Sequence, residues 1–527
     1  MTSPVPESSL LAPLAAEYGV TSDQLTEACA TGRRVAVLDD DPTGNQTIKD
    51  LPVITRWSPD DLRWALRQQT AAFFVLTNTR SLDPVAAEER TREAARACLA
   101  VAAEEGVELT FASRSDSTLR GHFPLEPETL AEESATAGQP VDAVIINPSY
   151  LDAGRLTVDG THWVRTPDGM VPAGETEYAS DATFGYRSSE LAAWVEEKTA
   201  GRIPRDQVVT ITVQDLRRDG PDGVTATLLG LTNHPRNDPV DVPSRIGPGP
   251  STSSGHVTGA GPSTGSGRVA GADPSAGSGH GFGLSWVVTD AVADDDLRVL
   301  TLGLIAAERA GRRFAYRVGP SFVRSRSGQF PAPPVDDAEL RPDPGTATAP
   351  GGLIIVGSHV PLSSRQLDRL TETTDATRLE LDVDKIIDST DPTHVAELAE
   401  RAAAEFDHRH AVITTSRTLR RGLDGAQSLA ISRAVSAAVV DLTKLIMERR
   451  RPAFVIAKGG ITSSDVATEA LGIRRATIRG TLLPGIVSLW QPAEGPAAGL
   501  PYVVFAGNVG TDDSLAEVVR RFDSARS

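Results

Sequence analysis

The sequence has little cysteine and no long apolar run. Its 527 residues include only Cys29 and Cys98, with no CxxC pair and no His/Cys cluster at zinc spacing. This pattern supports neither a disulfide framework nor a structural metal site. No run approaches the ~18 apolar residues of a transmembrane helix, and the N-terminus lacks a basic region followed by an apolar core. We therefore expect a cytoplasmic protein.

Positive charge is also in deficit. The chain has 52 basic and 70 acidic residues, a net charge of −18. This balance argues against nucleic acid or an anionic membrane as a general partner. It still allows one local cationic pocket to bind a small acid. The length predicts two or three domains, and the sequence does not decide between a monomer and a homodimer.

Four predicted strands in the N-terminal half end in polar loops. The apolar runs are Arg34–Leu38, Ala72–Leu76, Glu108–Ala112 and Ala143–Ile146. The first runs directly into Asp39, Asp40 and Asp41, and the second into Asn78 and Arg80. A solvated turn explains one aspartate more easily than three, because like charges raise one another's pKa. Since ligands bind at the carboxyl ends of strands in open α/β sheets, we expect these loops to line one cleft.

The third strand leads into the densest polar stretch, Ser113 to Pro124. Its Arg114 and Arg120 have planar guanidinium groups suited to a carboxylate, and Asp116 could hold sugar hydroxyl groups. The alternative is a capped helix start with an internal Arg–Asp pair. His122 and His162 are weaker catalytic candidates, because a lone histidine is more often a structural donor or a surface residue.

The C-terminal half has a strand, turn and helix pattern that is typical of anion binding. The apolar run Pro452–Ile456 is followed by Ala457-Lys458-Gly459-Gly460-Ile461-Thr462 and further hydroxyl residues. Helix N-termini carry unpaired N–H groups, and glycine lets a phosphate approach the backbone closely. Lys458 would add a positive charge. An ordinary strand-to-helix loop with a good N-cap is the alternative. Two further apolar strands also end in glycine, at Gly357-Ser358 and Gly507-Asn508.

Composition divides the chain into four segments. We predict an N-terminal helical extension (1–33), a first lobe (34–330), a proline-rich linker (331–350) and a second lobe (351–527). A twelve-residue repeat rich in glycine, serine and proline covers 249–283 and predicts a disordered insertion at about 246–283. The predicted fold is α/β, with two Rossmann-like three-layer lobes. Each lobe has a largely parallel sheet, and the active site lies in the cleft between them.

Four motifs, in this order, resemble the four-carbon acid sugar kinase family. They are Asp40-Asp41-Pro42-Thr43-Gly44, Ser113 to Gly121, Gly459-Gly460-Ile461-Thr462 and Gly507-Asn508-Val509-Gly510. The resemblance implies an acid-sugar-binding domain followed by a nucleotide-binding domain. It also implies ATP-dependent phosphorylation of the terminal hydroxyl of a tetronate, such as D-threonate, D-erythronate or an oxo-tetronate. The chain departs from the family at Asp39, where alanine is frequent, and in its extension and repeat insertion.

The motifs and the resemblance together give the candidate site residues. On the acid-sugar side they are Asp40, Asp41, Asn78, Arg80, Arg114, Asp116 and Arg120. On the nucleotide side they are Ser358, Lys458, Gly459, Gly460, Ile461, Thr462, Gly507 and Asn508.

A mechanism follows as a hypothesis. Arg114, with Arg80, would clamp the substrate carboxylate, and Asp40 or Asp41 would orient hydroxyl groups. One aspartate, with Asp116 favoured over Asp41, would accept the proton of the attacking hydroxyl. Mg²⁺ is expected with ATP because it neutralises phosphate oxygens, but the sequence does not identify its ligands.

Three rival functions are weighed against a tetronate kinase. The protein could be a non-catalytic two-lobed sensor, or a kinase for a larger or branched sugar acid. A dinucleotide-dependent dehydrogenase is disfavoured because no GxGxxG motif follows any predicted strand. The sequence also lacks a Walker A motif and the protein-kinase signature, so a kinase would have a different fold.

Overall fold

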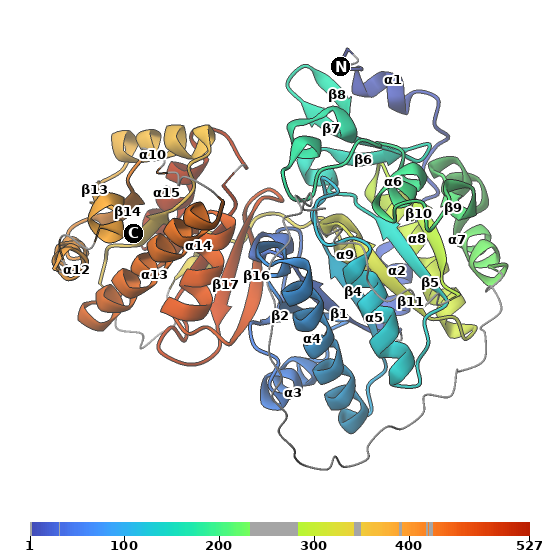
Figure 1. Cartoon of the computed structure of the whole chain (residues 1–527), viewed down its shortest axis with the longest axis horizontal. Coiled ribbons are helices and arrows are strands. Elements are labelled where there is room, and N and C mark those ends of the chain that lie inside the picture. The colour runs from blue at the N-terminus through green and yellow to red at the C-terminus, as the bar shows by residue number, and fades with distance from the viewer. Residues whose placement is uncertain are drawn as a thin grey trace, which may run out of the picture.

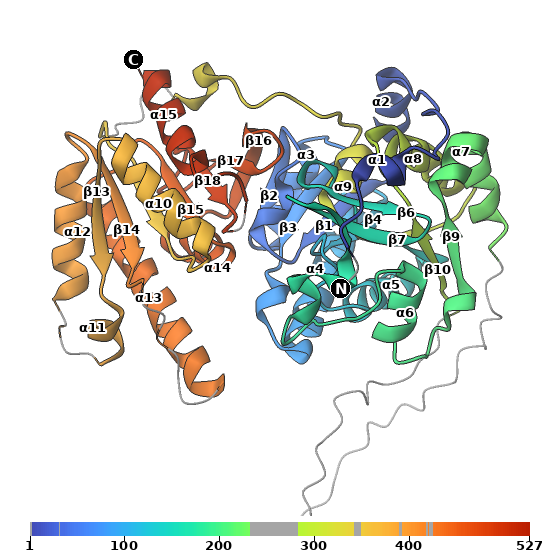
Figure 2. The same ribbon diagram turned by 90° about the horizontal axis from the view of Figure 1, so that it is seen from above.

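The computed structural model describes residues 3–30, 32–231, 283–341, 349–388, 391, 393–417, 420, 425–507 and 509–526. The predicted repeat insertion, up to residue 282, and Asn508 lie outside these residues. The chain forms two α/β lobes that lie side by side, with the N-terminal half in one and the C-terminal half in the other (Figures 1 and 2).

The N-terminal lobe contains a sheet of eight parallel strands in the order β2-β3-β1-β4-β11-β5-β10-β9. The strands are β1 (Arg34–Asp39), β2 (Leu51–Ile54), β3 (Ala72–Leu76), β4 (Leu109–Arg114), β5 (Ala143–Asn147), β9 (Val208–Ile211), β10 (Ser285–Thr289) and β11 (Phe314–Val318). Their central members are nearly continuous apolar runs, as is typical of parallel strands buried on both faces.

Helices cover both faces of this sheet. On one face, Ala36 and Phe73 pack in a cluster with Leu99 of α4. On the other face, Val37 and Phe74 belong to a separate core cluster that reaches α8. The alternation follows from the two-residue period of a strand. The helices of this lobe are α1 (Glu7–Leu11), α2 (Ser22–Ala30), α3 (Pro59–Arg67), α4 (Pro84–Glu105), α5 (Leu125–Thr136), α6 (Leu191–Lys198), α7 (Val213–Leu229), α8 (Asp294–Arg309) and α9 (Pro320–Arg326).

A small antiparallel sheet lies beside the carboxyl ends of the main strands. It consists of β6 (Arg155–Val158), β7 (Thr161–Thr166) and β8 (Gly169–Pro172). An antiparallel bridge between Tyr150 and Arg155 joins it to the end of β5, and another between Thr157 and Ala291 joins it to the end of β10. The small sheet is therefore fixed to the main sheet at both of these points.

The C-terminal lobe contains five parallel strands in the order β13-β14-β12-β15-β18, followed by antiparallel β17 and β16. Their bounds are β12 (Leu353–Val356), β13 (Ala376–Leu381), β14 (His410–Thr415), β15 (Val455–Lys458), β16 (Arg475–Leu483), β17 (Val487–Pro492) and β18 (Tyr502–Phe505). The helices are α10 (Pro361–Thr373), α11 (Val383–Ile387), α12 (His394–Glu405), α13 (Gly425–Arg449), α14 (Gly460–Asp465) and α15 (Ser514–Arg526). This arrangement and that of the first lobe confirm the predicted α/β fold.

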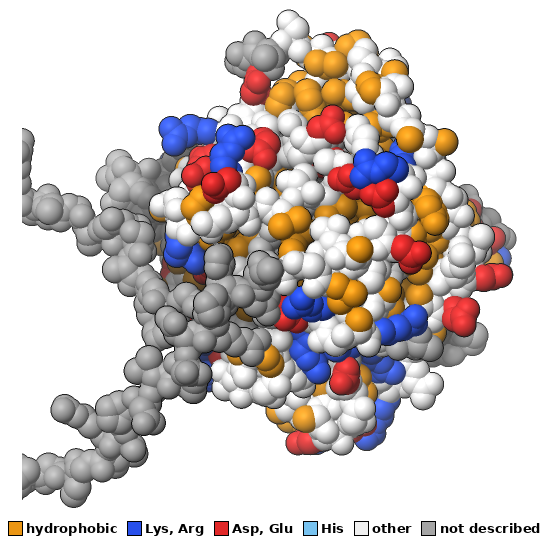
Figure 3. All heavy atoms as spheres, turned by 90° about the vertical axis from the view of Figure 1, so that its right-hand side faces the viewer, with side chains coloured by type: hydrophobic (Ala, Val, Ile, Leu, Met, Phe, Trp, Pro, Cys, Tyr) orange, Lys and Arg blue, Asp and Glu red, His pale blue; other side chains and the backbone are white. Residues whose placement is uncertain are grey.

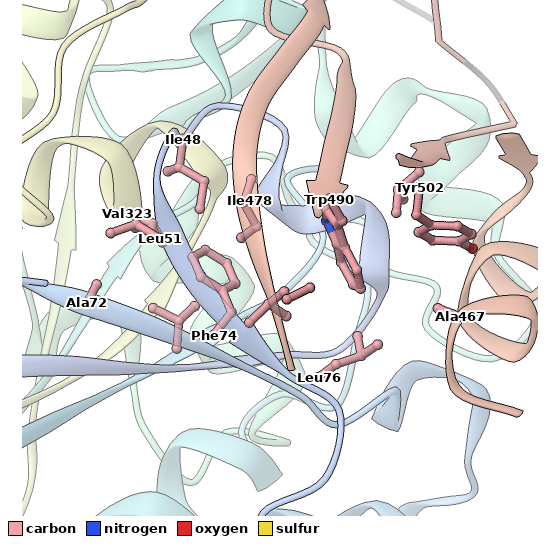
Figure 4. Close-up of a cluster of buried hydrophobic side chains, with 14 of the residues drawn as sticks. Ile48, Leu51, Ala72, Phe74, Leu76, Val323, Ala467, Ile478, Trp490 and Tyr502 are labelled. Carbon is pink, nitrogen blue, oxygen red and sulfur yellow. The ribbon is translucent and has the colours of Figure 1, made fainter. Parts of the chain in front are cut away.

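The two sheets are joined edge to edge. Strand β2 pairs with β16 in antiparallel register, from Ile54 opposite Arg475 to Leu51 opposite Ile478, so that one sheet of fifteen strands crosses both lobes. Figure 4 shows Leu51 and Phe74 of the first lobe near Ile478 and Trp490 of the second. The pairing covers two strand edges that would otherwise expose unpaired backbone groups.

The outer surface mixes charges of both signs. On the face of the N-terminal lobe in Figure 3, basic and acidic side chains lie close to one another between hydrophobic ones. The N-terminal lobe has ion pairs between exposed side chains, such as Arg218 with Asp219. Among the described residues, no helix combines the length and apolar character needed to cross a bilayer.

Candidate active site

A cleft of about 340 Å³ lies between the lobes, where the carboxyl ends of β1 and β4 face those of β15 and β18. Its size is suited to a small ligand. From the N-terminal lobe it is lined by Asp41, Thr43, Gln46, Arg80, Arg114, Asp116, Ser117, Arg120, Tyr150, Arg155 and Pro320. We call these residues the N-terminal wall. The C-terminal wall consists of Gly460, Ala506, Gly507 and Val509.

Arg80 forms ion pairs with two of the predicted aspartates, Asp40 and Asp41. Its Nε donates to Oδ2 of Asp40 at 3.0 Å, its Nη2 donates to the other oxygen, and its Nη1 lies 3.3 Å from Oδ2 of Asp41. Oδ1 of Asp41 accepts hydrogen bonds from the backbone N–H and the hydroxyl of Thr43. Burial raises the pKa of Asp41, but the charge of Arg80 and the hydrogen bonds from Thr43 together lower it by more. The pKa of Asp41 is therefore below its ordinary value. Asp41 is therefore ionised at neutral pH.

Arg114 lies beneath the first motif. Its Nε donates to Oδ1 of Asp39 at 2.7 Å, and its Nη2 donates to the carbonyl of Asp41 at 3.0 Å. A Cβ atom at position 44 would lie 1.8 Å from Nη2, so Gly44 is required for this approach. Burial raises the pKa of Asp39 to about 7, although Arg114 opposes the shift. The aspartate that departs from the family pattern is thus the partner of Arg114.

Asp116 is held in a second ion pair. Nε of Arg120 donates to its Oδ2 at 2.6 Å, and the hydroxyl of Thr118 donates to the same oxygen. Burial raises the pKa of Asp116, but the charges of Arg80 and Arg120 lower it well below its ordinary value. Beneath this loop, the buried Arg317 donates to the carbonyls of Asp116 and Arg120. No sequence motif points to Arg317, because its strand, β11, carries none.

Both candidate histidines support backbone. Nε2 of His162 lies 2.7 Å from the carbonyl of Ser117, and burial lowers the pKa of His162 to about 4. Nε2 of His122 lies 3.0 Å from the carbonyl of Thr79. Neither side chain is among those that line the cleft, which fits the structural role weighed for them.

On the C-terminal side, three glycine-bearing strand ends meet. Gly459 adopts a left-handed φ of 122° between β15 and α14, which favours glycine. A Cβ atom at Gly357 would lie 2.1 Å from Oγ1 of Thr462, and one at Gly507 would lie 2.6 Å from Oγ of Ser358. The predicted nucleotide residues Ser358, Gly459, Gly460, Thr462 and Gly507 are therefore brought together. The side chain of Ile461 and all of Asn508 lie outside what the structure describes.

Lys458 does not line the cleft. Its Nζ is buried, donates to the carbonyl of Ala506 at 3.0 Å and lies 4.0 Å from the centre of the Phe505 ring. Burial lowers the pKa of this amine to about 7. The side chain thus links β15 to the end of β18. The sequence predicted instead that its amine would face the phosphates of a nucleotide.

Contacts across the cleft connect the two walls. A Cβ atom at Gly460 would lie 2.8 Å from Oδ2 of Asp41, so Asp41 is in close contact with the start of α14. Asn78 has a left-handed φ of 54° and donates from Nδ2 to the hydroxyl of Ser464 in the same helix. Asn78 therefore bridges the lobes and does not line the cleft.

Comparison with known proteins agrees with this division. Residues 35–237 match a family described as the sugar-binding N-terminal domain, and residues 353–515 match one described as the nucleotide-binding C-terminal domain. The chain thus contains a region similar to a sugar-binding domain in its first lobe and a region similar to a nucleotide-binding domain in its second lobe. Asp41, Arg80, Arg114 and Asp116 belong to the first domain, and Gly460 and Gly507 belong to the second. No curated protein sequence matches the chain.

Solved structures share the whole two-domain fold. A protein of Salmonella typhimurium LT2, provisionally called a tRNA synthase, is 17% identical with a TM-score of 0.60. That match covers 93% of this chain and 99% of the other. Protein HI1011 of Haemophilus influenzae, assigned to the family DUF1537, is 16% identical with a TM-score of 0.54, over 95% and 97% of the two chains. At these identities the likeness shows the fold alone.

Proposed function

We propose that the protein is an ATP-dependent kinase that phosphorylates the terminal hydroxyl of a four-carbon acid sugar. The observation that carries the proposal is the contact between Asp41 of the sugar-binding domain and Gly460, at the first turn of α14 in the nucleotide-binding domain. The contact lies in a cleft lined by four arginines and only two aspartates, which suits an anionic substrate.

Phosphoryl transfer requires mainly that its reactants be positioned and their charge neutralised. ATP would place its phosphates at the glycine-rich strand ends, beside the first N–H groups of α14, which have no partner within their own helix. The terminal hydroxyl oxygen of the acid would attack the γ-phosphorus, and the bond to the β–γ bridging oxygen would break. ADP would leave, and the hydroxyl proton would pass to a carboxylate.

Asp41 is the better placed of the two candidate bases. It lies against the C-terminal wall, whereas Asp116 is bound to Arg120 and Thr118 of its own loop. We therefore assign proton acceptance to Asp41, and to Asp116 the orientation of Arg120 and of substrate hydroxyl groups. This reverses the preference for Asp116 that the sequence favoured.

Mg²⁺ belongs to the proposal as the partner of ATP. The described residues contain no group of three or more His, Cys, Asp or Glu side chains arranged to hold a metal ion. The ion would therefore enter mainly as a ligand of the ATP phosphates, where it neutralises their charge. Asp41 contacts the glycine turn at Gly460. A cytoplasmic location and a homodimeric state stay predictions.

The test is ADP release from MgATP with a panel of acids: D-erythronate, D-threonate, L-threonate, both oxo-tetronates, D-glycerate and a control without acid. We expect one tetronate to raise ADP release well above the control. If ATP binds and no acid raises the rate, a panel of larger and branched sugar acids separates a different substrate from the sensor alternative. A sensor would bind an acid without releasing ADP.

A further inference from the structure

The four arginines of the N-terminal wall are not equivalent. Arg80, Arg114 and Arg120 each form an ion pair with an aspartate of the same lobe. Arg155, at the start of β6, forms no such pair within the part of the chain that the structure describes. One of its hydrogen bonds goes from Nη1 to the carbonyl of Ala153 at 2.6 Å. Its Nε is buried and has no partner among the described residues.

A second unpaired donor lies in the same part of the cleft. Gln46 is only 2% exposed, and its Oε1 accepts a hydrogen bond from the hydroxyl of Tyr150 at 2.6 Å. In this orientation of the amide, Nε2 is a buried donor that has no partner among the described residues. A buried donor without an acceptor costs free energy unless a ligand supplies the acceptor.

Tyr150 holds both donors in place. Its backbone N–H and carbonyl exchange hydrogen bonds of 3.0 Å with those of Arg155, and the Arg155 guanidinium carbon lies 5.9 Å from the centre of its ring. Its hydroxyl oxygen also lies beside the carbonyl of Gly485 in the other lobe, and its single hydrogen is donated either to this carbonyl or to Oε1 of Gln46. Gln46 and Arg155 are thus both held by contacts with Tyr150.

From this geometry we infer that Gln46 and Arg155 form the subsite that binds the carboxylate of the acid. A carboxylate has two acceptor oxygens, and a guanidinium with a neighbouring amide supplies matching N–H donors. The inference rests on the proposed function and revises it, because the sequence assigned the clamp to Arg114 and Arg80. Those two guanidinium groups are already engaged by Asp39, Asp40 and Asp41.

The subsite also places the substrate along the cleft. The acid group would lie beside Tyr150, and the terminal hydroxyl would lie at Asp41 and Gly460. The ion-paired Asp116 and Arg120 would face the hydroxyl groups in between. A neutral sugar alcohol would leave the Arg155 charge unpaired in a largely buried place, so the subsite would discriminate acids from alcohols.

The experiment measures binding by calorimetry without requiring turnover. Each acid of the panel, together with erythritol and threitol as neutral counterparts, is titrated into the wild-type protein and into the Arg155→Met and Gln46→Leu variants. MgATP is titrated separately. For the acid that binds, we expect Kd to rise by about 30- to 100-fold in Arg155→Met and about 5- to 10-fold in Gln46→Leu. Binding of MgATP should stay within twofold.

Arg187→Met is the matched control. The Arg187 side chain is 93% exposed and lies outside the cleft, so this variant should bind acid like the wild type. The inference is overturned if Arg155→Met binds the acid normally, if it weakens MgATP instead, or if the wild type binds alcohols as well as acids. It is also overturned if no acid binds. Acid binding that depends on Arg155 in a protein that releases no ADP would uphold the subsite and reject the kinase.

Discussion

The two walls of the cleft offer a ligand different kinds of contact. The N-terminal wall carries six charged side chains, and five of them form ion pairs, such as Arg80 with Asp41 and Arg120 with Asp116. The C-terminal wall consists of uncharged residues, two of them glycines, and the neighbouring Lys458 is turned away from the cleft. We infer that one wall distinguishes substrates by side-chain charge, whereas the other binds a group common to all nucleotides through its backbone.

The difference predicts opposite sensitivities to mutation. On the N-terminal wall, a change of charge at constant shape should alter recognition or turnover and leave the backbone in place. On the C-terminal wall, the addition of a single methyl group should be harmful because it removes the space that a phosphate needs.

The largest effect on turnover is expected from Asp41→Asn. The change keeps the shape of the side chain and removes the proposed proton acceptor, so kcat should fall by about 10² to 10⁴-fold with the acid and MgATP still bound. Steady-state kinetics with the acid found in the panel would measure it. Asp116→Asn is the comparison, and it should mainly raise KM for the acid because it releases Arg120. A larger fall in kcat for Asp116→Asn than for Asp41→Asn would show that Asp116 is the base.

The second effect in size is expected from Gly460→Ala. No left-handed φ is required at this position, so alanine is compatible with the backbone, but its Cβ would lie 2.8 Å from Oδ2 of Asp41. A displacement of that carboxylate by about 1 Å should lower kcat on the order of 10²-fold without loss of thermal stability. Gly32→Ala is the control, because a Cβ there meets no atom closer than 3.5 Å. An unchanged kcat would show that Asp41 and the glycine turn do not act together.

How much of this site the sequence predicts depends on how local each feature is. A strand that runs into Asp39, Asp40 and Asp41 shows its polar end directly, and the parallel α/β fold follows from four such strands. Which charges are already paired is decided by contacts between loops, such as Arg80 with Asp40 and Asp41, and these have no signature in the sequence. Arg155 was overlooked for the same reason, since nothing in its own segment shows that the other three arginines are engaged.

The junction of the lobes shows a second limit. The pairing of β2 with β16 joins Leu51 to Ile478, more than four hundred residues apart, and neither strand carries a motif. Each strand alone satisfies the pattern of an edge strand in its own sheet. Only the shared packing with Phe74 and Trp490 selects the continuous sheet, and that packing is a property of the folded chain.

The smallest effect is expected at Lys458, and it tests whether the C-terminal wall lacks a fixed positive charge. Burial depresses the pKa of its amine from its ordinary value near 10.5 to about 7, so between these values the unfolded chain binds more protons than the folded one. The contribution of this group to the free energy of unfolding should therefore rise as the pH rises from about 7 to about 10, which stabilises the folded protein. In Lys458→Met this contribution is absent. The difference in unfolding free energy between wild type and variant should shift by about 3 to 4 kcal/mol in favour of the wild type over this range.

Chemical denaturation at several pH values from 7 to 10 would measure the shift. Lys444→Met is the control, because Lys444 in α13 is exposed and the same substitution there removes no buried amine. A constant difference for Lys458→Met would mean that the amine is charged throughout, as it would be if it faced the cleft. The C-terminal wall would then contain a fixed positive charge for the nucleotide, and its contrast with the N-terminal wall would be smaller.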